Sequence, residues 1–170
     1  MRIQQHMILI TIITALSMTA CATAQELRLT GPINSLAFTL MDDDTYMVSA
    51  GAAAKGAVNI PAYYRPGAES DFLPVTTIDG GAFGDCTAIT RVTIPATVTE
   101  IGYGAFANCA GLARVTIPAS VTAVWKHAFQ YWTESQTIII EGRADREEAV
   151  AAGWDEGWDS DCAAVIIYGK

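Results

Sequence analysis

Apolar residues recur at a fixed interval in the middle of the chain, between Ile78 and Ile140. The first copy of the pattern starts at Ile78 and the second at Ile101, so each copy is 23 residues long. The matching positions are apolar, and most of the intervening ones are not. Such a period indicates one structural unit stacked on itself, because a single copy cannot bury its own apolar face. The pattern therefore predicts a repeat solenoid.

Each copy predicts one short strand followed by a turn. In the second copy Val115 and Ile117 alternate with polar residues, so both side chains point to the same side of a strand. Pro118 is expected to end this strand because proline has no N–H for a ladder bond. Phe106 is predicted to fill the interior of the coil. Stacking would pair each strand in parallel with its equivalent in the next coil, which predicts a mostly β fold.

The same pattern starts earlier in a weaker form. Val58-Asn59-Ile60-Pro61 matches the strand of the later copies, so the repeats are expected to span residues 58–140. This first coil is longer than the others, and the surplus, residues 63–72, is expected to bulge out as a loop. Its tyrosines, Tyr63 and Tyr64, are of a type that favours interfaces. The alternative is a loop tucked against its own coil.

Both ends of the repeat region carry sequences that predict caps. Residues 32–50 contain two alternating stretches around the acidic turn 42–44, which predicts a β-hairpin. Residues 141–170 predict a helix after Asp145, with Glu148 completing a capping box, and then a strand. Such caps would cover the open ends of a stack. A single repeat domain is therefore expected over residues 32–170.

The start of the chain predicts export. Residues 1–20 carry an uncharged apolar run that is too short to span a membrane and is typical of a secretory signal. Met18-Thr19-Ala20-Cys21 resembles a bacterial lipobox, which would make Cys21 the site of lipid attachment and residues 21–31 a tether. The alternative is cleavage after Ala22-Thr23-Ala24, which would release a chain that starts at Gln25.

The charge balance excludes one class of partner. The chain has 10 basic and 18 acidic residues, and removing the leader with Arg2 leaves a net charge of −9. Proteins that bind nucleic acid need a basic surface, so nucleic acid is not an expected partner. Electrostatic docking to anionic lipid is disfavoured for the same reason. Contact with a membrane is expected only through the lipid anchor at Cys21.

No set of residues predicts catalysis or a cofactor. Outside the leader His127 is the one histidine available for proton transfer, and it is expected to face solvent. No metal or nucleophile motif occurs, so we expect no enzyme activity, no cofactor and no metal. Cys86 and Cys109 hold the same place in adjacent copies. They are expected to be buried thiols, and a disulfide between them is the alternative.

The second copy carries a family resemblance through a set of apolar, glycine and proline positions. These positions are Ile101-Gly102, Ala105-Phe106, Cys109, Leu112, Val115, Ile117-Pro118 and Val121. The pattern resembles the BspA-like leucine-rich repeat of bacterial surface proteins, with Gly81 and Trp132 as departures. The resemblance implies a leucine-rich repeat solenoid on a secreted or surface-anchored protein. It also implies a role in adhesion or protein binding.

Residues that point outward from the predicted strands form the candidate partner-binding face. This face comprises Arg91, Thr93, Arg114, Thr116 and Ile139. Arginine is a common anchor of interfaces, and repeat solenoids bind through such columns. The alternative is that the two arginines only keep an acidic stack soluble, paired with Glu100 or Asp85.

The sequence therefore predicts a non-enzymatic, surface-anchored leucine-rich repeat protein that binds an unidentified protein partner or acts in adhesion. It is expected at the cell surface or as an outer membrane lipoprotein, or otherwise in a secreted or periplasmic form. One alternative is a structural or antigenic envelope component with no dedicated ligand. A secreted enzyme is a second alternative, for which the sequence offers no catalytic residues.

Overall fold

The structure is a computed structural model that describes residues 35–51 and 54–169. These residues all belong to one compact unit, Gly31–Lys170. The predicted signal, the lipid attachment site Cys21 and the tether lie outside the described residues and stay predictions. The bounds of the caps and of the repeat domain are likewise predictions.

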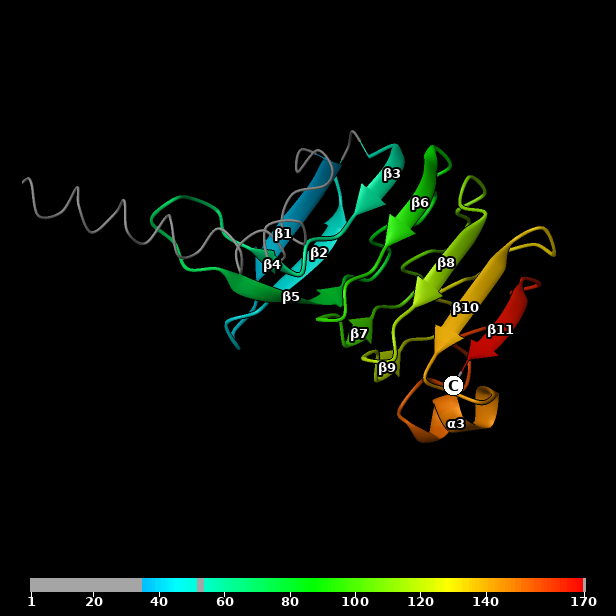
Figure 1. The fold of residues 1–170 in the computed structure, drawn as a ribbon. Coiled ribbons are helices and arrows are strands. Elements are labelled where there is room, and N and C mark those ends of the chain that lie inside the picture. The colour runs from blue at the N-terminus through cyan, green and yellow to red at the C-terminus, as the bar shows by residue number, and fades with distance from the viewer. Residues whose placement is uncertain (1–34, 52–53, 170) are drawn as a thin grey trace, which may run out of the picture. The chain divides into compact units, whose positions relative to one another are not determined.

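One face of the unit is a stack of five strands that lie side by side (Figure 1). They are β3 (Gly56–Asn59), β6 (Ile89–Thr93), β8 (Arg114–Ile117), β10 (Thr137–Glu141) and β11 (Val165–Gly169). Parallel ladders join β3 to β6 and join β8, β10 and β11 in that order. No ladder joins β6 to β8. The two prolines that follow β6 and β8, Pro95 and Pro118, lie outside these strands, as predicted.

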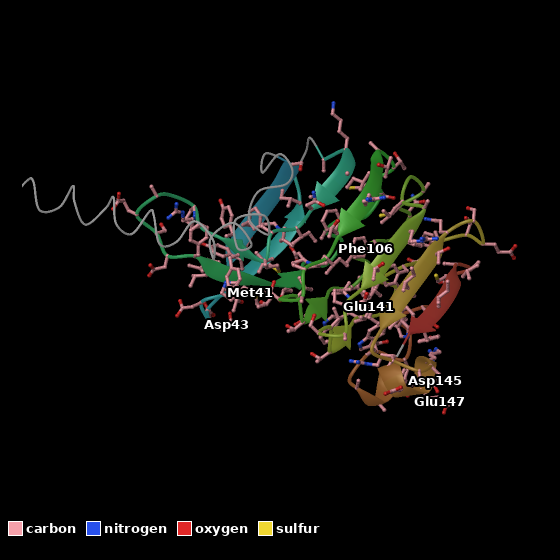
Figure 2. All side chains as sticks on the ribbon, viewed as in Figure 1. Met41, Asp43, Phe106, Glu141, Asp145 and Glu147 are labelled. Atoms are coloured by element: carbon pink, nitrogen blue, oxygen red, sulfur yellow. The ribbon has the colours of Figure 1, made fainter. Side chains whose placement is uncertain are left out.

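A second sheet forms another side of the coils. It contains β1 (Leu36–Leu40), β2 (Tyr46–Ala50), β5 (Leu73–Ile78), β7 (Glu100–Ile101) and β9 (Ala123–Val124), in that order. The β1–β2 pair is an antiparallel hairpin, and Figure 2 places Asp43 at its turn. In the parallel part Ile78 pairs with Ile101, and Ile101 with Val124. The paired residues are 23 positions apart in the sequence, so one repeat of the sequence forms one coil of the stack.

The helix α3 (Arg146–Ala151) follows the repeats. Asp145 caps it, because its Oδ1 accepts a hydrogen bond of 2.8 Å from the backbone N–H of Glu148. The carboxylate of Glu148 in turn accepts a bond of 2.6 Å from the N–H of Ala144. Gly153 follows the helix with a φ of +114°. The chain then returns to the sheet as β11, which pairs in parallel with β10.

A column of phenylalanines fills the interior of the coils. Phe83, Phe106 and Phe129 are fully buried, and their rings stack at centroid distances of 5.2 and 5.5 Å, nearly parallel. Figure 2 shows Phe106 in this interior. Trp158 closes the column with its ring edge-on to Phe129 at 6.1 Å. The prediction that Phe106 belongs to the core is confirmed.

Trp132 takes over the role of the cysteine that it replaces. The buried thiol of Cys109 donates to the carbonyl of Phe83, with 2.9 Å between Sγ and O. Trp132 Nε1 donates to the carbonyl of Phe106 at 2.7 Å, which is the equivalent acceptor one coil later. The departure at Trp132 therefore keeps the hydrogen bond of the repeat. Cys86 and Cys109 are free thiols, so the disulfide alternative is not what the structure shows.

The expectation of a bulging loop over residues 63–72 is wrong at the start of that segment. Tyr63 and Tyr64 form the strand β4, which pairs antiparallel with the start of β5. The ring of Tyr64 stacks on Phe38 at 3.8 Å and meets Tyr46 edge-on at 5.0 Å. These aromatic partners come from the hairpin β1–β2, which the repeat period does not describe. Residues 65–71 are exposed.

Two expectations about the turns are also wrong. Gly81 does not depart from the repeat, because Gly81, Gly104 and His127 hold equivalent places and have φ values of +66°, +59° and +60°. His127 does not face solvent, because its side chain is only 17 % exposed. Its ring lies edge-on to Tyr103 at 5.5 Å, and its Nδ1 lies 4.0 Å from a carboxylate oxygen of Asp161.

Candidate partner-binding surface

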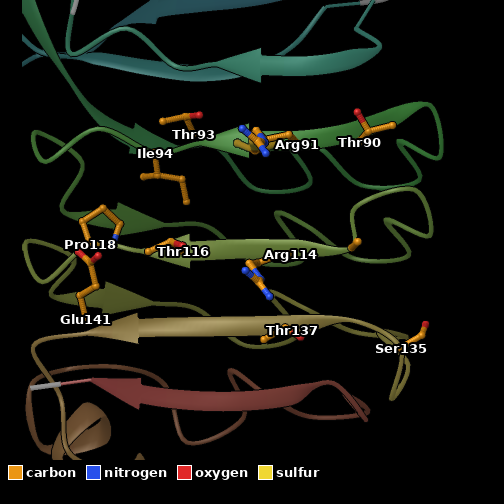
Figure 3. A pocket seen from close by; sticks show the side chains of 12 residues that line it. Thr90, Arg91, Thr93, Ile94, Arg114, Thr116, Pro118, Ser135, Thr137 and Glu141 are labelled. Atoms are coloured by element: carbon orange, nitrogen blue, oxygen red, sulfur yellow. The ribbon is translucent and has the colours of Figure 1, made fainter.

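A groove lies on the outer face of the first strand stack, between β6 and β8 (Figure 3). It has a volume of about 710 Å³. Its polar lining residues are Thr90, Arg91, Thr93, Arg114, Thr116, Ser135, Thr137 and Glu141. The groove is thus lined by two cations, one carboxylate and a set of hydroxyl groups, with Ile94 and Pro118 among its apolar residues.

The groove exists because the ladder is interrupted between two coils. The backbone of Gly111, just before β8, packs closely against the previous coil, since a Cβ there would lie 2.2 Å from the carbonyl oxygen of Thr87. Beyond this contact β6 pairs only with β3, and β8 only with β10. The space between the two strands is open on the outer face, and Figure 3 shows the largely buried Ile94 between them.

Arg91 and Arg114 are exposed in this groove and have no ion-pair partner among the described residues. The two acids proposed as partners in the alternative are engaged elsewhere. Glu100 accepts a hydrogen bond of 2.6 Å from Trp125 Nε1. Asp85 accepts one of 2.7 Å from the side-chain amide of Asn108. The alternative in which the arginines pair with Glu100 or Asp85 is therefore wrong. The N–H donors of both guanidinium groups stay available for a ligand.

The structure brings together four of the five residues predicted for the binding face. Arg91, Thr93, Arg114 and Thr116 line the groove, whereas Ile139 does not. Ile139 is half-buried in β10, paired with Thr116 on one side and with Ile167 on the other.

Sequence reasoning missed other residues of the groove. Thr137 stands one period after Arg114, and Glu141 stands one period after Pro118. Extending the 23-residue step to the third copy would have found both. Thr90 has no such signal. Ser135 stands one period after the buried Leu112, so the period would have placed it in the interior.

The basic groove is followed along the stack by an aliphatic surface. Arg114 pairs in register with Thr137, and Thr137 pairs with Val165. Val165 is 50 % exposed and Ile167 is 48 % exposed on β11. The outer face of the strands therefore changes from cationic at β6 and β8 to aliphatic at β11.

The described thiols are not activated nucleophiles. Burial raises the pKa of Cys109 to about 12, and the nearby Cys86 adds to this effect. Burial also raises the pKa of Cys86 and of Cys162. A reactive cysteine needs the opposite shift.

Within residues 35–51 and 54–169 no group of three or more His, Cys, Asp and Glu residues is placed to hold a metal ion. No helix in the same ranges is both long and apolar enough to cross a membrane.

Comparison with known proteins identifies the repeats. The family model described as "BspA type Leucine rich repeat region (6 copies)" matches residues 68–146. None of the curated proteins compared with this chain matches it.

Solved structures show the same fold. The chain resembles the leucine-rich repeat protein of T. pallidum with 27 % identity and a TM-score of 0.55, over 66 % of this chain and 53 % of that one. It thus spans about half the length of that protein. It resembles a leucine-rich repeat protein from Bacteroides capillosus with 23 % identity and a TM-score of 0.62, over 81 % of this chain and 97 % of that one. Residues 68–146 of this chain are a leucine-rich repeat region of the BspA type.

Proposed function

We propose that this chain is a non-enzymatic protein-binding module whose partner docks over the groove between β6 and β8. One observation carries the proposal: Arg91 and Arg114 lie exposed in a groove on the strand stack with no carboxylate partner among the described residues. Arginine is enriched at the energetic centres of interfaces. Solenoids of stacked repeats bind partners through extended surfaces of this kind.

We also propose that the module is held at the cell surface, as a lipoprotein with the lipid on Cys21. The support is the sequence alone, where an apolar run ends in Met18-Thr19-Ala20-Cys21. Mass spectrometry of the mature N-terminus tests this proposal, and we expect an acylated Cys21. A free N-terminal Gln25 would contradict it and would favour a secreted or periplasmic form. Cys21→Ser should release the protein without its lipid.

Photo-cross-linking in the producing cells tests the binding face. With p-benzoylphenylalanine in place of Thr116 in the groove, we expect a cross-link to a defined partner that mass spectrometry can identify. The matched control carries the same group in place of Tyr103, which is 60 % exposed on a turn outside the groove. A cross-link from position 103 and none from position 116 would show that the face is wrong.

Charge reversal separates binding from folding. Arg91→Glu with Arg114→Glu should abolish the cross-link from position 116, because both guanidinium groups would be replaced by repelling carboxylates. The midpoint of chemical unfolding should stay nearly unchanged, since exposed residues without partners contribute little to stability. If no partner is cross-linked by the native chain, a structural role with no dedicated ligand replaces this proposal.

A further inference from the structure

We infer that the part of the partner that docks on this face is an extended segment carrying two carboxylates followed by an aliphatic side chain. The carboxylates would lie on Arg91 and Arg114, and the aliphatic side chain on Val165 and Ile167. This inference rests on the proposed function and adds the chemistry of the partner to it.

The cationic half of the face selects for carboxylates. Arg91 and Arg114 stand on neighbouring strands, and neither forms an ion pair among the described residues. They outnumber the one carboxylate that lines the groove, Glu141. A guanidinium group binds a carboxylate through two parallel hydrogen bonds, which fixes direction as well as distance. The chain as a whole carries a net charge of −8. An acidic segment is therefore repelled by most of the chain's charge and attracted at this groove, which favours a single docking site.

The aliphatic half of the face selects for an apolar side chain. Val165 and Ile167 point outward from β11, and each leaves about half of its surface in contact with water. Half-buried Ile139 lies beside Ile167 in the sheet register. Covering such a surface with an aliphatic side chain removes apolar area from water, which is favourable. Acidic groups alone would leave this surface exposed.

The strand spacing sets the order and distance of the groups. The residues Arg114, Thr137 and Val165 lie in register on three successive strands. Neighbouring strands are about 4.8 Å apart, so Arg114 and Val165 are separated by roughly 10 Å at the backbone. An extended peptide covers this distance in about three residues. Arg91 lies on the strand before Arg114, so the first carboxylate belongs one or two residues earlier.

These distances define a probe, a fluorescein-labelled peptide with the sequence Gly-Glu-Glu-Ser-Ser-Val-Ser-Gly. Its two glutamates precede the valine by four and three residues. Two matched peptides complete the set, one with Gln-Gln in place of Glu-Glu and one with Ser in place of Val. Binding to the full chain is measured by fluorescence polarisation.

We expect the acidic peptide to bind and both matched peptides to bind about tenfold more weakly, the size of effect that loss of one anchoring contact produces. Binding should weaken as salt is added, because exposed ion pairs are screened. The double variant Arg91→Gln with Arg114→Gln should bind the acidic peptide more weakly by about the same factor. The control Arg65→Gln with Lys126→Gln removes the same charge outside the groove and should change nothing.

Several outcomes would overturn the inference while leaving the proposed function intact. One is failure of the native chain to bind the acidic peptide, and another is equal binding of the Gln-Gln peptide. Equal loss in the control variant would also overturn it, since general charge would then explain binding. A partner cross-linked from position 116 through a segment without carboxylates would do so as well.

The nature of the occupant is tested in the same samples. If the native chain self-associates in solution and Arg91→Gln with Arg114→Gln makes it monomeric, a second copy occupies the face and the inference is wrong. The proposed function itself fails if no partner is cross-linked, or if one is cross-linked from position 103 and none from position 116.

Discussion

The side chain of Phe106 lies between those of Phe83 and Phe129, with ring centroids 5.2 and 5.5 Å away. All three rings are shielded from water. Each coil therefore supplies one large apolar ring, and each ring completes its burial only against the coils above and below. A residue in the middle of the column has partners on both sides, which makes it the most sensitive position to test.

Phe106→Ala should lower the free energy of unfolding by about 3–5 kcal/mol, because it removes a buried ring and leaves a cavity between two others. Denaturant unfolding followed by circular dichroism measures this change. Tyr103→Ala is the matched control, since it truncates an aromatic residue of the same coil that is largely exposed. An unchanged midpoint for Phe106→Ala would contradict its place in the core.

Gly111 tests the close contact between two coils. A Cβ at this position would lie 2.2 Å from the carbonyl oxygen of Thr87 and 2.7 Å from that of Ile89. Both atoms belong to the backbone, so Gly111→Ala forces the coils apart and should destabilise the protein by about 1–3 kcal/mol. Gly67→Ala should have little effect, since nothing lies within 4 Å of its Cβ position. Thermal unfolding of the two variants checks this difference.

At the scale of elements, the break between β6 and β8 distinguishes this stack. The ladders β3–β6 and β8–β10–β11 are complete on either side of it. The interior column of phenylalanines passes this level without interruption, since Phe83 stacks on Phe106. The core therefore holds the coils together where the outer ladder does not, and the groove opens at little cost to packing.

The stability of helix α3 depends on the hydrogen bond that caps its N-terminus. Asp145→Ala removes the side-chain acceptor for the N–H of Glu148, so we expect a loss of about 1 kcal/mol in the free energy of unfolding. Figure 2 shows Asp145 and Glu147 at this helix. Glu147→Ala is the control, because Glu147 is exposed in the first turn and is not the capping residue. Equal stability of the two variants would contradict the capping role.

At the scale of the whole described unit, one core connects its two ends. A single cluster of buried apolar residues runs from Tyr46 in β2 to Trp158 after α3. Backbone bonds join successive coils, as from Gly102 to Ile78 and from Asp155 to Val124. Stability in such a stack is shared between neighbouring units. No coil in the described residues has a core of its own.

This continuity predicts one cooperative unfolding transition. The four tryptophans, Trp125, Trp132, Trp154 and Trp158, all lie in the C-terminal part of the unit, so their fluorescence reports on that part. Hydrogen exchange of the β2 and β5 amides reports on the other end. We expect both probes to give the same midpoint in denaturant. Two separated midpoints would show that the ends unfold independently.

The sequence by itself determined the repeat, its length of 23 residues and the fold class. Phe106, Val115 and Ile117 could be assigned to the core because each contacts its own equivalents one period away, and a period is visible in one dimension. The cap of α3 could also be predicted, since Asp145 and Glu148 are three residues apart. The outward-facing pair Arg91 and Arg114 could be predicted as well, because these two residues are also one period apart.

Only the tertiary structure decided the features that depend on residues unrelated by the period. The ring of Tyr64 stacks on that of Phe38, and His127 lies against Tyr103 and near Asp161, through contacts between different parts of the chain. The engagement of Glu100 by Trp125 is what leaves one predicted partner unavailable to the arginines. The opening between β6 and β8 likewise depends on how two coils separate beyond Gly111. A repeat pattern describes what the coils share, and the candidate site is built from where they differ.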